Sequence, residues 1–313
     1  MNANLNRPIA PGRGTAGALF IAALLCALLA IAAPAAADRP VEETRPVDAD
    51  ARISIETLSG KVVVTGWNRN EVQITGTVGD DTGGLRIEGD AGDLQIEVDI
   101  PEGRHRGQRD LDVDLRISVP AGARLEVESV SSSAEVSGVG GEVDVESVSG
   151  SVDIDGAPES ASAETVSGAI RVIGSRGRVH AESVSGSVEV QGGSGEVHAG
   201  TVSGRVAVEV GTIARGHLES VSGGVRFSGA LASGGELEIE GHSGGIDVAL
   251  PAGTSARFRV ETFSGGIDNQ LSGDTARRTS QYAPGRELAF TLGGGDGAVR
   301  IESFSGAVTL RPQ

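Results

Sequence analysis

The stretch from Glu146 to Gly223 contains five versions of one phrase: ESVSG, ETVSG, ESVSG, GTVSG and ESVSG. The phrases end at Gly150, Gly168, Gly186, Gly204 and Gly223, so the first three steps are equal and the last is longer by a single position. Such a regular repeat is typical of proteins in which each repeat is one structural unit stacked on the next. This phrase is therefore the feature that decides the fold.

Polar and apolar residues alternate between the phrases, as in SVDIDG (151–156), SVEVQG (187–192) and GEVHA (195–199). Such alternation predicts strands that are buried on one face. Each unit is then a strand, a turn, a second strand and a corner. A unit this short cannot bury its own apolar face, but stacking at about 4.8 Å pairs every backbone group with the next unit. We predict an all-β, single-stranded β-solenoid (β-helix) with coils of about 18–21 residues.

The Ser-Gly pair that closes each phrase is predicted to form the corner of a coil. Glycine is expected where the backbone needs a positive φ or where coils approach too closely for a Cβ atom. The serines are expected to stack into a ladder of hydroxyls that bond to the backbone at the bend. A structural role is favoured over a nucleophile, because a catalytic serine needs to occur only once. The pairs are Ser149 and Gly150, Ser167 and Gly168, Ser185 and Gly186, Ser203 and Gly204, and Ser222 and Gly223.

Residues 1–37 have the pattern of a secretory signal peptide. Arg7 and Arg13 precede an apolar run from Ala16 to Ala33, and cleavage is expected after about Ala37. Without cleavage this run would be a membrane anchor. We expect membrane contact only in that case. The single cysteine lies inside the run, so the mature chain is expected to contain no disulfide. The predicted location is outside the cytoplasm: periplasmic, outer-membrane-associated or extracellular.

The remaining boundaries follow from where the repeat is regular. Residues 38–50 are polar and contain proline, which predicts a linker. Residues 51–127 are predicted to be a β-strand region of degenerate coils, because four repeat lengths separate Gly60 from Ser132. Residues 128–270 are the regular solenoid repeats. Residues 271–313, in which the pattern is interrupted and then returns, are predicted to form capping coils with a loop insertion.

The pattern E-[S/T]-Φ-S-G-x-Φ-x-Φ-x-G, the segment VTGWNRNEVQITG (64–76) and the phrase LRISVPAG (115–122) carry a family resemblance. From about Arg52 to Leu310 the chain resembles a bacterial family of unknown function with β-strand repeats, described as putative adhesins. The resemblance implies a β-helical fold outside the cytoplasm and, in some relatives, a part in the envelope-stress response. It implies no catalytic residues.

Stacked coils place equivalent residues in columns, and the first residue of the phrase is usually glutamate. Like charges at coil spacing repel one another and raise each other's pKa, so a column of carboxylates favours bound cations. Calcium is the natural candidate, as a weak ligand, and cationic peptides are another. The alternative is a charged edge that prevents aggregation. In chain order the column is Glu128, Glu146, Glu164, Glu182, Gly200, Glu219, Glu240, Glu261 and Glu302, and the candidate cation ligands are Glu146, Glu164 and Glu182.

A second column contains His180, His198 and His217. Three imidazoles at coil spacing, with Glu182 or Glu219 nearby, suggest zinc or nickel. Histidines that simply face solvent are the alternative interpretation.

Composition limits the function further. The chain has a formal net charge of −17, so nucleic acid is not an expected partner. Aromatic residues make up 3% of the sequence and the carboxylates are spread along the repeats, so the grooves of polysaccharide-cleaving β-helices are a poor match.

We predict an exported, non-enzymatic protein that binds or scaffolds at the bacterial cell envelope in the manner of an adhesin, with an envelope partner such as a cationic peptide or a polysaccharide. The alternatives are a periplasmic envelope-stress sensor that binds cationic peptides or divalent cations, and a polysaccharide-acting β-helix enzyme.

Overall fold

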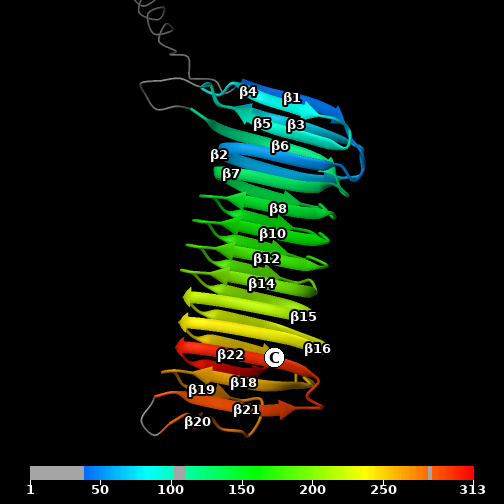
Figure 1. Cartoon of the computed structure of the whole chain (residues 1–313). Helices are drawn as coiled ribbons and strands as arrows, with labels where there is room; N and C mark the ends of the chain where they lie inside the picture. The colour runs from blue at the N-terminus through cyan, green and yellow to red at the C-terminus, as the bar shows by residue number, and fades with distance from the viewer. Residues whose placement is uncertain (1–38, 102–109, 281–283) are drawn as a thin grey trace, which may run out of the picture. The chain divides into compact units, whose positions relative to one another are not determined.

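The computed structural model describes residues 39–101, 110–280 and 284–313. The predicted signal peptide, residues 1–37, lies outside these residues. Asp38–Gln313 form one compact unit, and the regular elements of its described part are β-strands that join in a single mixed sheet (Figure 1). The described residues contain no helix with the length and apolar character needed to cross a membrane. The expectation of an all-β fold is confirmed.

The middle of this unit is a regular stack of coils with two strands each. In adjacent coils equivalent residues pair in parallel, so Val143 lies beside Ala161 and Ala161 beside Val179. The short strands of the opposite wall pair with the same offset of one repeat, as Val152 does with Ile170. The strands are β8 (Glu142–Ser147), β9 (Val152–Asp155), β10 (Ser160–Thr165), β11 (Ile170–Ile173), β12 (Arg178–Ser183), β13 (Val188–Gln191) and β14 (Gly195–Thr201).

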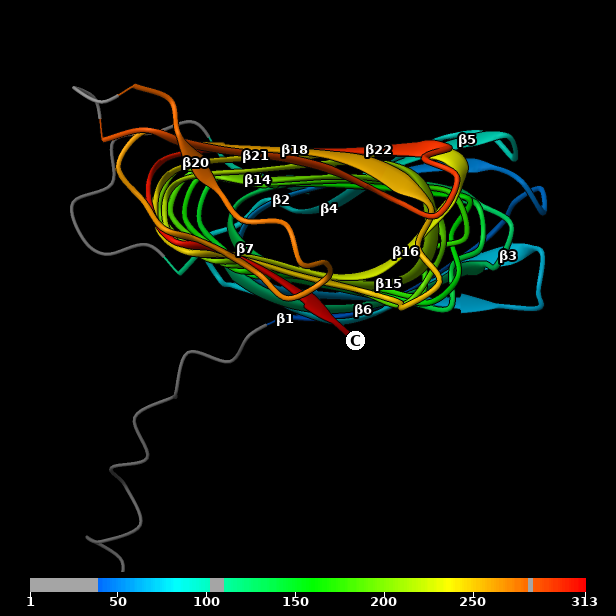
Figure 2. The same cartoon turned by 90° about the horizontal axis from the view of Figure 1, so that it is seen from below.

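The core lies between the two strand walls of each coil, which form a flattened ring when the stack is seen along its axis (Figure 2). The inward residues of one wall include Val145 and Ala163, and those of the other include Val152 and Ile170, all at most 1% exposed. A fully buried valine or isoleucine contributes about 1.5–3 kcal/mol relative to an exposed one. The alternating pattern thus stabilises coils that have no helix or second sheet to cover them.

The corner glycines lie directly over one another. A Cβ atom added to Gly168 would lie 1.9 Å from the carbonyl oxygen of Gly150, and one added to Gly186 would lie 1.7 Å from that of Gly168. Neither residue has a φ in the left-handed region. Close approach of the coils, and not a positive φ, is therefore the reason for glycine at these corners.

The prediction that the serines before the corner glycines form a ladder of hydroxyls bonded at the bend is wrong. Ser149 and its equivalents Ser167, Ser185, Ser203 and Ser222 have exposed side chains. Their backbone N–H groups bond to the preceding coil, as Ser149 does to the Val130 carbonyl oxygen at 2.7 Å. The inward hydroxyls belong to the second residue of the phrase, because alternation turns that side chain toward the core.

The amino-terminal end is a mixed cap. Its strands are β1 (Arg39–Pro46), β2 (Arg52–Trp67), β3 (Glu71–Val78), β4 (Gly84–Gly89), β5 (Asp93–Asp99), β6 (Asp112–Pro120) and β7 (Arg124–Ser137). The prediction of a linker over residues 38–50 is wrong for residues 39–46, because β1 pairs antiparallel with β3 along its whole length. The prolines near the two ends of β1 fit an edge strand, which tolerates a missing N–H.

Residues 51–127 do not form successive degenerate coils. β2 lies directly beside β7, so Gly60 pairs with Ser132 although four repeat lengths separate them along the chain. On its other side β2 pairs with β5 and β6, while β3 and β4 are antiparallel to β6 and β5. The match to a multiple of the repeat is a coincidence: the chain leaves the stack after β2, builds the cap and returns one coil away.

The carboxyl-terminal end shows a second departure from chain order. Its strands are β15 (Val206–Ser222), β16 (Val225–Ser243), β17 (Ile246–Leu250), β18 (Ala256–Thr262), β19 (Ile267–Asn269), β20 (Arg277–Arg278), β21 (Arg286–Leu292), β22 (Gly297–Ser305) and β23 (Val308–Pro312). β22 is inserted between β16 and β18 and is parallel to both. The predicted cap of residues 271–313 is therefore divided: β21 covers β18 in antiparallel orientation, whereas β22 and β23 form an internal coil.

Candidate functional site

Each repeat phrase builds one segment of a groove. In Glu146-Ser147-Val148 the glutamate side chain points outward, the serine is 6% exposed and the valine is 50% exposed. Alternation places the first and third residues of the phrase on the same outer face, with the inward second residue between them along the chain. Stacking the phrase therefore produces a wall of carboxylates, a floor of hydroxyls and an apolar wall.

The first wall, here named the glutamate column, runs along most of the stack. Its members pair in register from coil to coil, with Gly200 as a gap between Glu182 and Glu219. Glu302 is not the last member, as chain order suggested, but lies between Glu240 and Glu261 because β22 is inserted there. In spatial order the column is Glu97, Glu56, Glu128, Glu146, Glu164, Glu182, Gly200, Glu219, Glu240, Glu302, Glu261 and Glu287.

The opposite wall, here named the apolar column, consists of large hydrophobic side chains that are 44–52% exposed. Sequence reasoning missed it, although the third position of each phrase is almost always valine or phenylalanine. At one end Phe304 stacks between His242 and Phe263, with ring centroids 4.7 and 4.9 Å apart. The members are Val130, Val148, Val166, Val184, Val202, Val221, Phe304 and Phe263.

The floor between the two walls is polar but closed. The hydroxyls of Ser129 and Ser147 share a hydrogen bond, Oγ to Oγ, at 3.0 Å. Ser183 and Thr201 donate to the carbonyl oxygens of Gly168 and Gly186, at 3.0 and 2.9 Å. Most of these hydroxyls are thus bonded within the stack, whereas the buried Oγ1 of Thr165 has no hydrogen-bond partner among the described residues.

The resulting groove has a volume of about 620 Å³ between Glu56 and Glu219. A second section of about 480 Å³ shares Glu219 and continues to Glu261, with Phe263 and Phe304 on its apolar side. Six glutamates line the first section, and its lining contains no lysine, arginine or histidine. The surface that the groove presents is therefore acidic on one side and apolar on the other.

The carboxylates of the groove are only partly neutralised. Desolvation by its neighbours raises the pKa of Glu146, and the charges of Asp144 and Glu164 raise it further. In the described part of the chain, Glu128, Glu146 and Glu240 form no ion pair. Glu261 and Glu302 are paired with Arg259 and Arg300, each at 2.5 Å. The uncompensated charge is greatest in the first section.

The histidine column lies beside the glutamate column. His180 and His198 stack with ring centroids 4.8 Å apart, and His198 and His217 with centroids 5.0 Å apart. Glu182 contacts the first two histidines, whereas His217 faces Glu219 and Glu238. Of the cation ligands expected from the sequence, the structure brings Glu164, Glu182, His180 and His198 together. Glu146 lies in the column but outside this cluster.

These features define a class: a repeat-built, all-β protein with one continuous amphipathic groove along its stack. The family comparison agrees with the repeat, since residues 51–311 match the model of the Toastrack family DUF4097. The chain belongs to this family. No curated protein matches it.

Solved structures with similarity to this chain come from more than one bacterial genus. A putative adhesin from Parabacteroides distasonis is 10% identical, with 88% of this chain and 98% of that chain covered and a TM-score of 0.43. A putative adhesin from Parabacteroides merdae is 11% identical, with 88% and 99% covered and a TM-score of 0.36. A putative cell adhesion protein from Clostridium sporogenes is 12% identical, with 88% and 100% covered and a TM-score of 0.23.

Proposed function

We propose that this chain is an exported, non-enzymatic binding or scaffolding protein of the cell envelope, acting in the manner of an adhesin. Its groove would hold a basic, amphipathic polypeptide segment of a partner. The observation that carries this proposal is the pairing of the glutamate column with the apolar column along one continuous groove.

Charge complementarity selects the sign of the partner. Six carboxylates line the first section without a basic side chain among them. Aligned charges of one sign attract polymers of the opposite sign and repel nucleic acid. Lysine and arginine side chains of a partner would neutralise the carboxylates, including Glu128 and Glu146, which have no ion-pair partner among the described residues.

The apolar column selects an amphipathic partner over a purely charged one. Contiguous apolar surface on a soluble protein commonly marks an interaction site. Val148, Val166 and Val184 are each about half exposed, at 50%, 48% and 46%. A partner that covers them with leucine or valine side chains gains about 25 cal/mol for each Å² of apolar surface buried.

The spacing of the coils favours a helical segment. Coils repeat at about 4.8 Å, and an α-helix rises about 5.4 Å per turn, whereas side chains on one face of an extended strand repeat at about 6.6 Å. Over four turns, the side chains of a helix laid along the groove therefore shift relative to the coils by only about half a coil spacing. Such a helix can place one apolar and one basic side chain on each of several successive coils.

A binding role also fits the way in which the groove is composed. Nearly every coil presents the same glutamate, hydroxyl and apolar side chain, so the surface is polyvalent and has no unique position. Catalysis needs one constellation of different groups at one place. Repetition of a single set suits cumulative binding along a polymer.

The binding test is a fluorescence anisotropy titration of the purified chain with a labelled helical peptide of lysine and leucine. The triple variant Glu128→Gln, Glu146→Gln and Glu164→Gln should weaken binding about tenfold, from about 0.5 kcal/mol for each exposed charge pair. The triple variant Val148→Ser, Val166→Ser and Val184→Ser should also weaken it. Calcium is titrated as a competitor, since carboxylates are its ligands.

The matched control removes the same charge from three positions on the opposite strand wall, none of which lines the groove: Asp153→Asn, Glu189→Gln and Glu209→Gln. This variant should bind the peptide within about twofold of the wild type, because distant exposed charges are screened by salt. Equal weakening by the control and the groove variant would show general charge attraction and would contradict a groove site.

Location is tested separately on intact cells. Digestion of the chain by protease added outside the cells is expected for an adhesin-like protein at the surface. Full protection, with digestion only after the outer membrane is opened, would instead favour a periplasmic sensor that uses the same groove to detect cationic peptides.

A further inference from the structure

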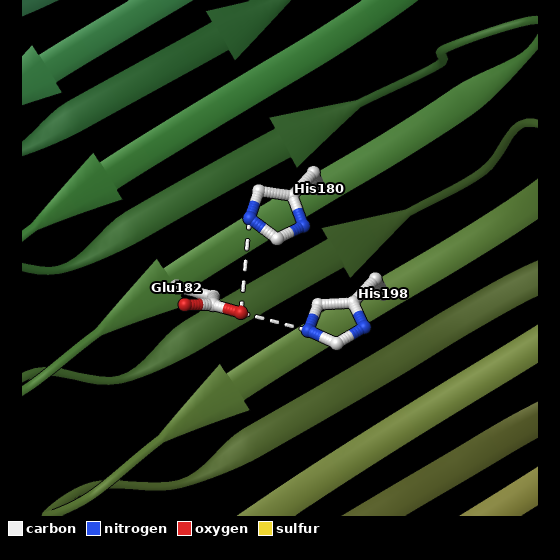
Figure 3. A group of neighbouring side chains, drawn as sticks. All are labelled: His180, Glu182 and His198. Carbon is white, nitrogen blue, oxygen red and sulfur yellow. Dashed lines mark hydrogen bonds and ion pairs between the residues drawn. The ribbon is translucent and has the colours of Figure 1, made fainter.

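His180, Glu182 and His198 form a cluster at the edge of the groove, of which only Glu182 lines the groove itself. His180 and Glu182 are both on β12, and His198 is the in-register neighbour of His180 on β14. Figure 3 shows both imidazole rings presenting a nitrogen to the same carboxylate oxygen of Glu182. All three side chains are accessible, with 34% of each histidine and 44% of the glutamate exposed.

The donor atoms already lie near the separation that a tetrahedral metal requires. Glu182 Oε1 is 2.8 Å from His198 Nε2 and 3.7 Å from His180 Nε2, and the three donors lie within 4.8 Å of one another. Ligands at about 2.0–2.1 Å from a tetrahedral zinc ion are about 3.3 Å apart. The two contacts of Glu182 lie on either side of that value, and the two imidazole nitrogens, which are within 4.8 Å of each other, must approach by side-chain rotation to close the site.

The chemistry of the donors selects the metal. Two imidazole nitrogens and one carboxylate suit zinc, whereas calcium prefers six to eight oxygen ligands. Glu164 Oε1 lies 3.3 Å from His180 Nε2 and is near enough to fill the fourth position. Neighbouring carboxylates also compensate the charge of a divalent ion.

The gap in the glutamate column restricts the site to this pair of coils. The residue that would repeat the role of Glu182 one coil further is Gly200, which pairs with Glu182 in register. His198 and His217 stack as the first two histidines do, but no carboxylate stands at the equivalent place between them. His217 instead contacts Glu238 through Nδ1 at 3.5 Å.

We propose that His180, Glu182 and His198 bind one Zn²⁺ ion on the outer surface of coils β12 and β14. The inference goes beyond the binding of a basic polypeptide and does not depend on it. A metal here ties two adjacent coils together through their side chains, next to the acidic wall of the groove.

The experiment is equilibrium dialysis of the purified full chain against ZnCl₂ without any peptide. The wild type is expected to retain one zinc ion per chain at saturation. His198→Ala and Glu182→Gln should each weaken zinc affinity about tenfold or more, equivalent to about 1.4 kcal/mol. Thermal melting without zinc checks that each variant is folded as the wild type is.

His217→Ala is the matched control, because this histidine stacks on His198 but is outside the donor set. It should bind zinc within about twofold of the wild type. Unchanged affinity in His198→Ala, or an equal loss in His217→Ala, would overturn the proposed site. Zinc retention that falls with Glu128→Gln as much as with Glu182→Gln would also overturn it, by showing diffuse binding to the carboxylates. Because no peptide is present, each result leaves the test of the groove unaffected.

Discussion

At the scale of single residues, the corner of each coil is decided by one contact between backbones. The space beside Gly168 is filled by the carbonyl group of Gly150, and the same relation repeats at Gly186, Gly204 and Gly223. Any side chain here forces neighbouring coils apart and stretches the hydrogen bonds of the bend. Glycine is therefore required by distance between coils, which explains why it recurs with the period of the repeat.

We expect Gly168→Ala to lower the free energy of unfolding by about 1–3 kcal/mol, the usual cost of overpacking. Urea unfolding followed by circular dichroism measures the change. Gly266→Ala is the control, since an added Cβ meets nothing within 4 Å there and the residue has no left-handed φ. The control should stay within about 0.5 kcal/mol of the wild type. Similar stability of the two variants would contradict close contact at the corner.

The raised pKa of Glu146 predicts a small stability effect that depends on pH. A carboxyl whose pKa is higher in the folded state stabilises the fold below its unfolded value of 4.5, and this contribution is lost as the pH rises through the folded pKa. Glu146→Gln should therefore raise stability by up to about 0.5 kcal/mol near pH 7 and match the wild type near pH 3.5.

The stability of Glu146→Gln and of the wild type is measured by urea unfolding at both pH values. Glu135→Gln is the control. Glu135 forms an ion pair with Lys61 at 2.7 Å, so its neutralisation should lower stability near pH 7 by at most about 1 kcal/mol. A loss of stability in Glu146→Gln at neutral pH would show that desolvation and repulsion within the glutamate column are not the dominant effects.

At the scale of strands, period-two alternation predicted which faces are buried, and the regular repeat predicted the parallel register of β8, β10, β12 and β14. The order of coils at both ends was not predictable in this way. β2 and β22 carry the same alternation as their neighbours, so each fits equally well against several coils. Their places are set by the chain connections at the caps, which have no repeat. β1 was missed because its polar, proline-containing sequence suits an edge strand as well as a linker.

The candidate site was predictable in part. The glutamate and histidine columns follow from reading one repeat position down the stack, and in-register pairing places their members side by side. The apolar column was missed although Val148 lies two positions from Glu146 and therefore on the same outward side of the chain. The contact of Glu182 with two histidines depends on side-chain direction and could not be derived from register alone.

At the scale of the whole β unit, successive repeats in the sequence occupy successive levels of the stack. The exception is where a strand from later in the chain is inserted, as β22 is between β16 and β18. The insertion of β22 completes the second section of the groove, because Glu302 and Phe304 fill the level between Glu240 and Glu261. The two sections meet at Glu219, which lines both, and so belong to one surface. The binding proposal depends on this spatial order more than on any single residue.

Distances between pairs of nitroxide labels test that order most directly. With Cys26 replaced by serine, cysteines are introduced at Ser149 and at one of three exposed corner positions, Ser243, Ser305 or Ser264. We expect separations of about 24, 29 and 34 Å respectively, from five, six and seven coil steps of about 4.8 Å. Ser305 should thus lie closer to Ser149 than Ser264 does, although it comes later in the chain. A longer distance to Ser305 than to Ser264 would contradict the inserted coil and the continuous groove built on it.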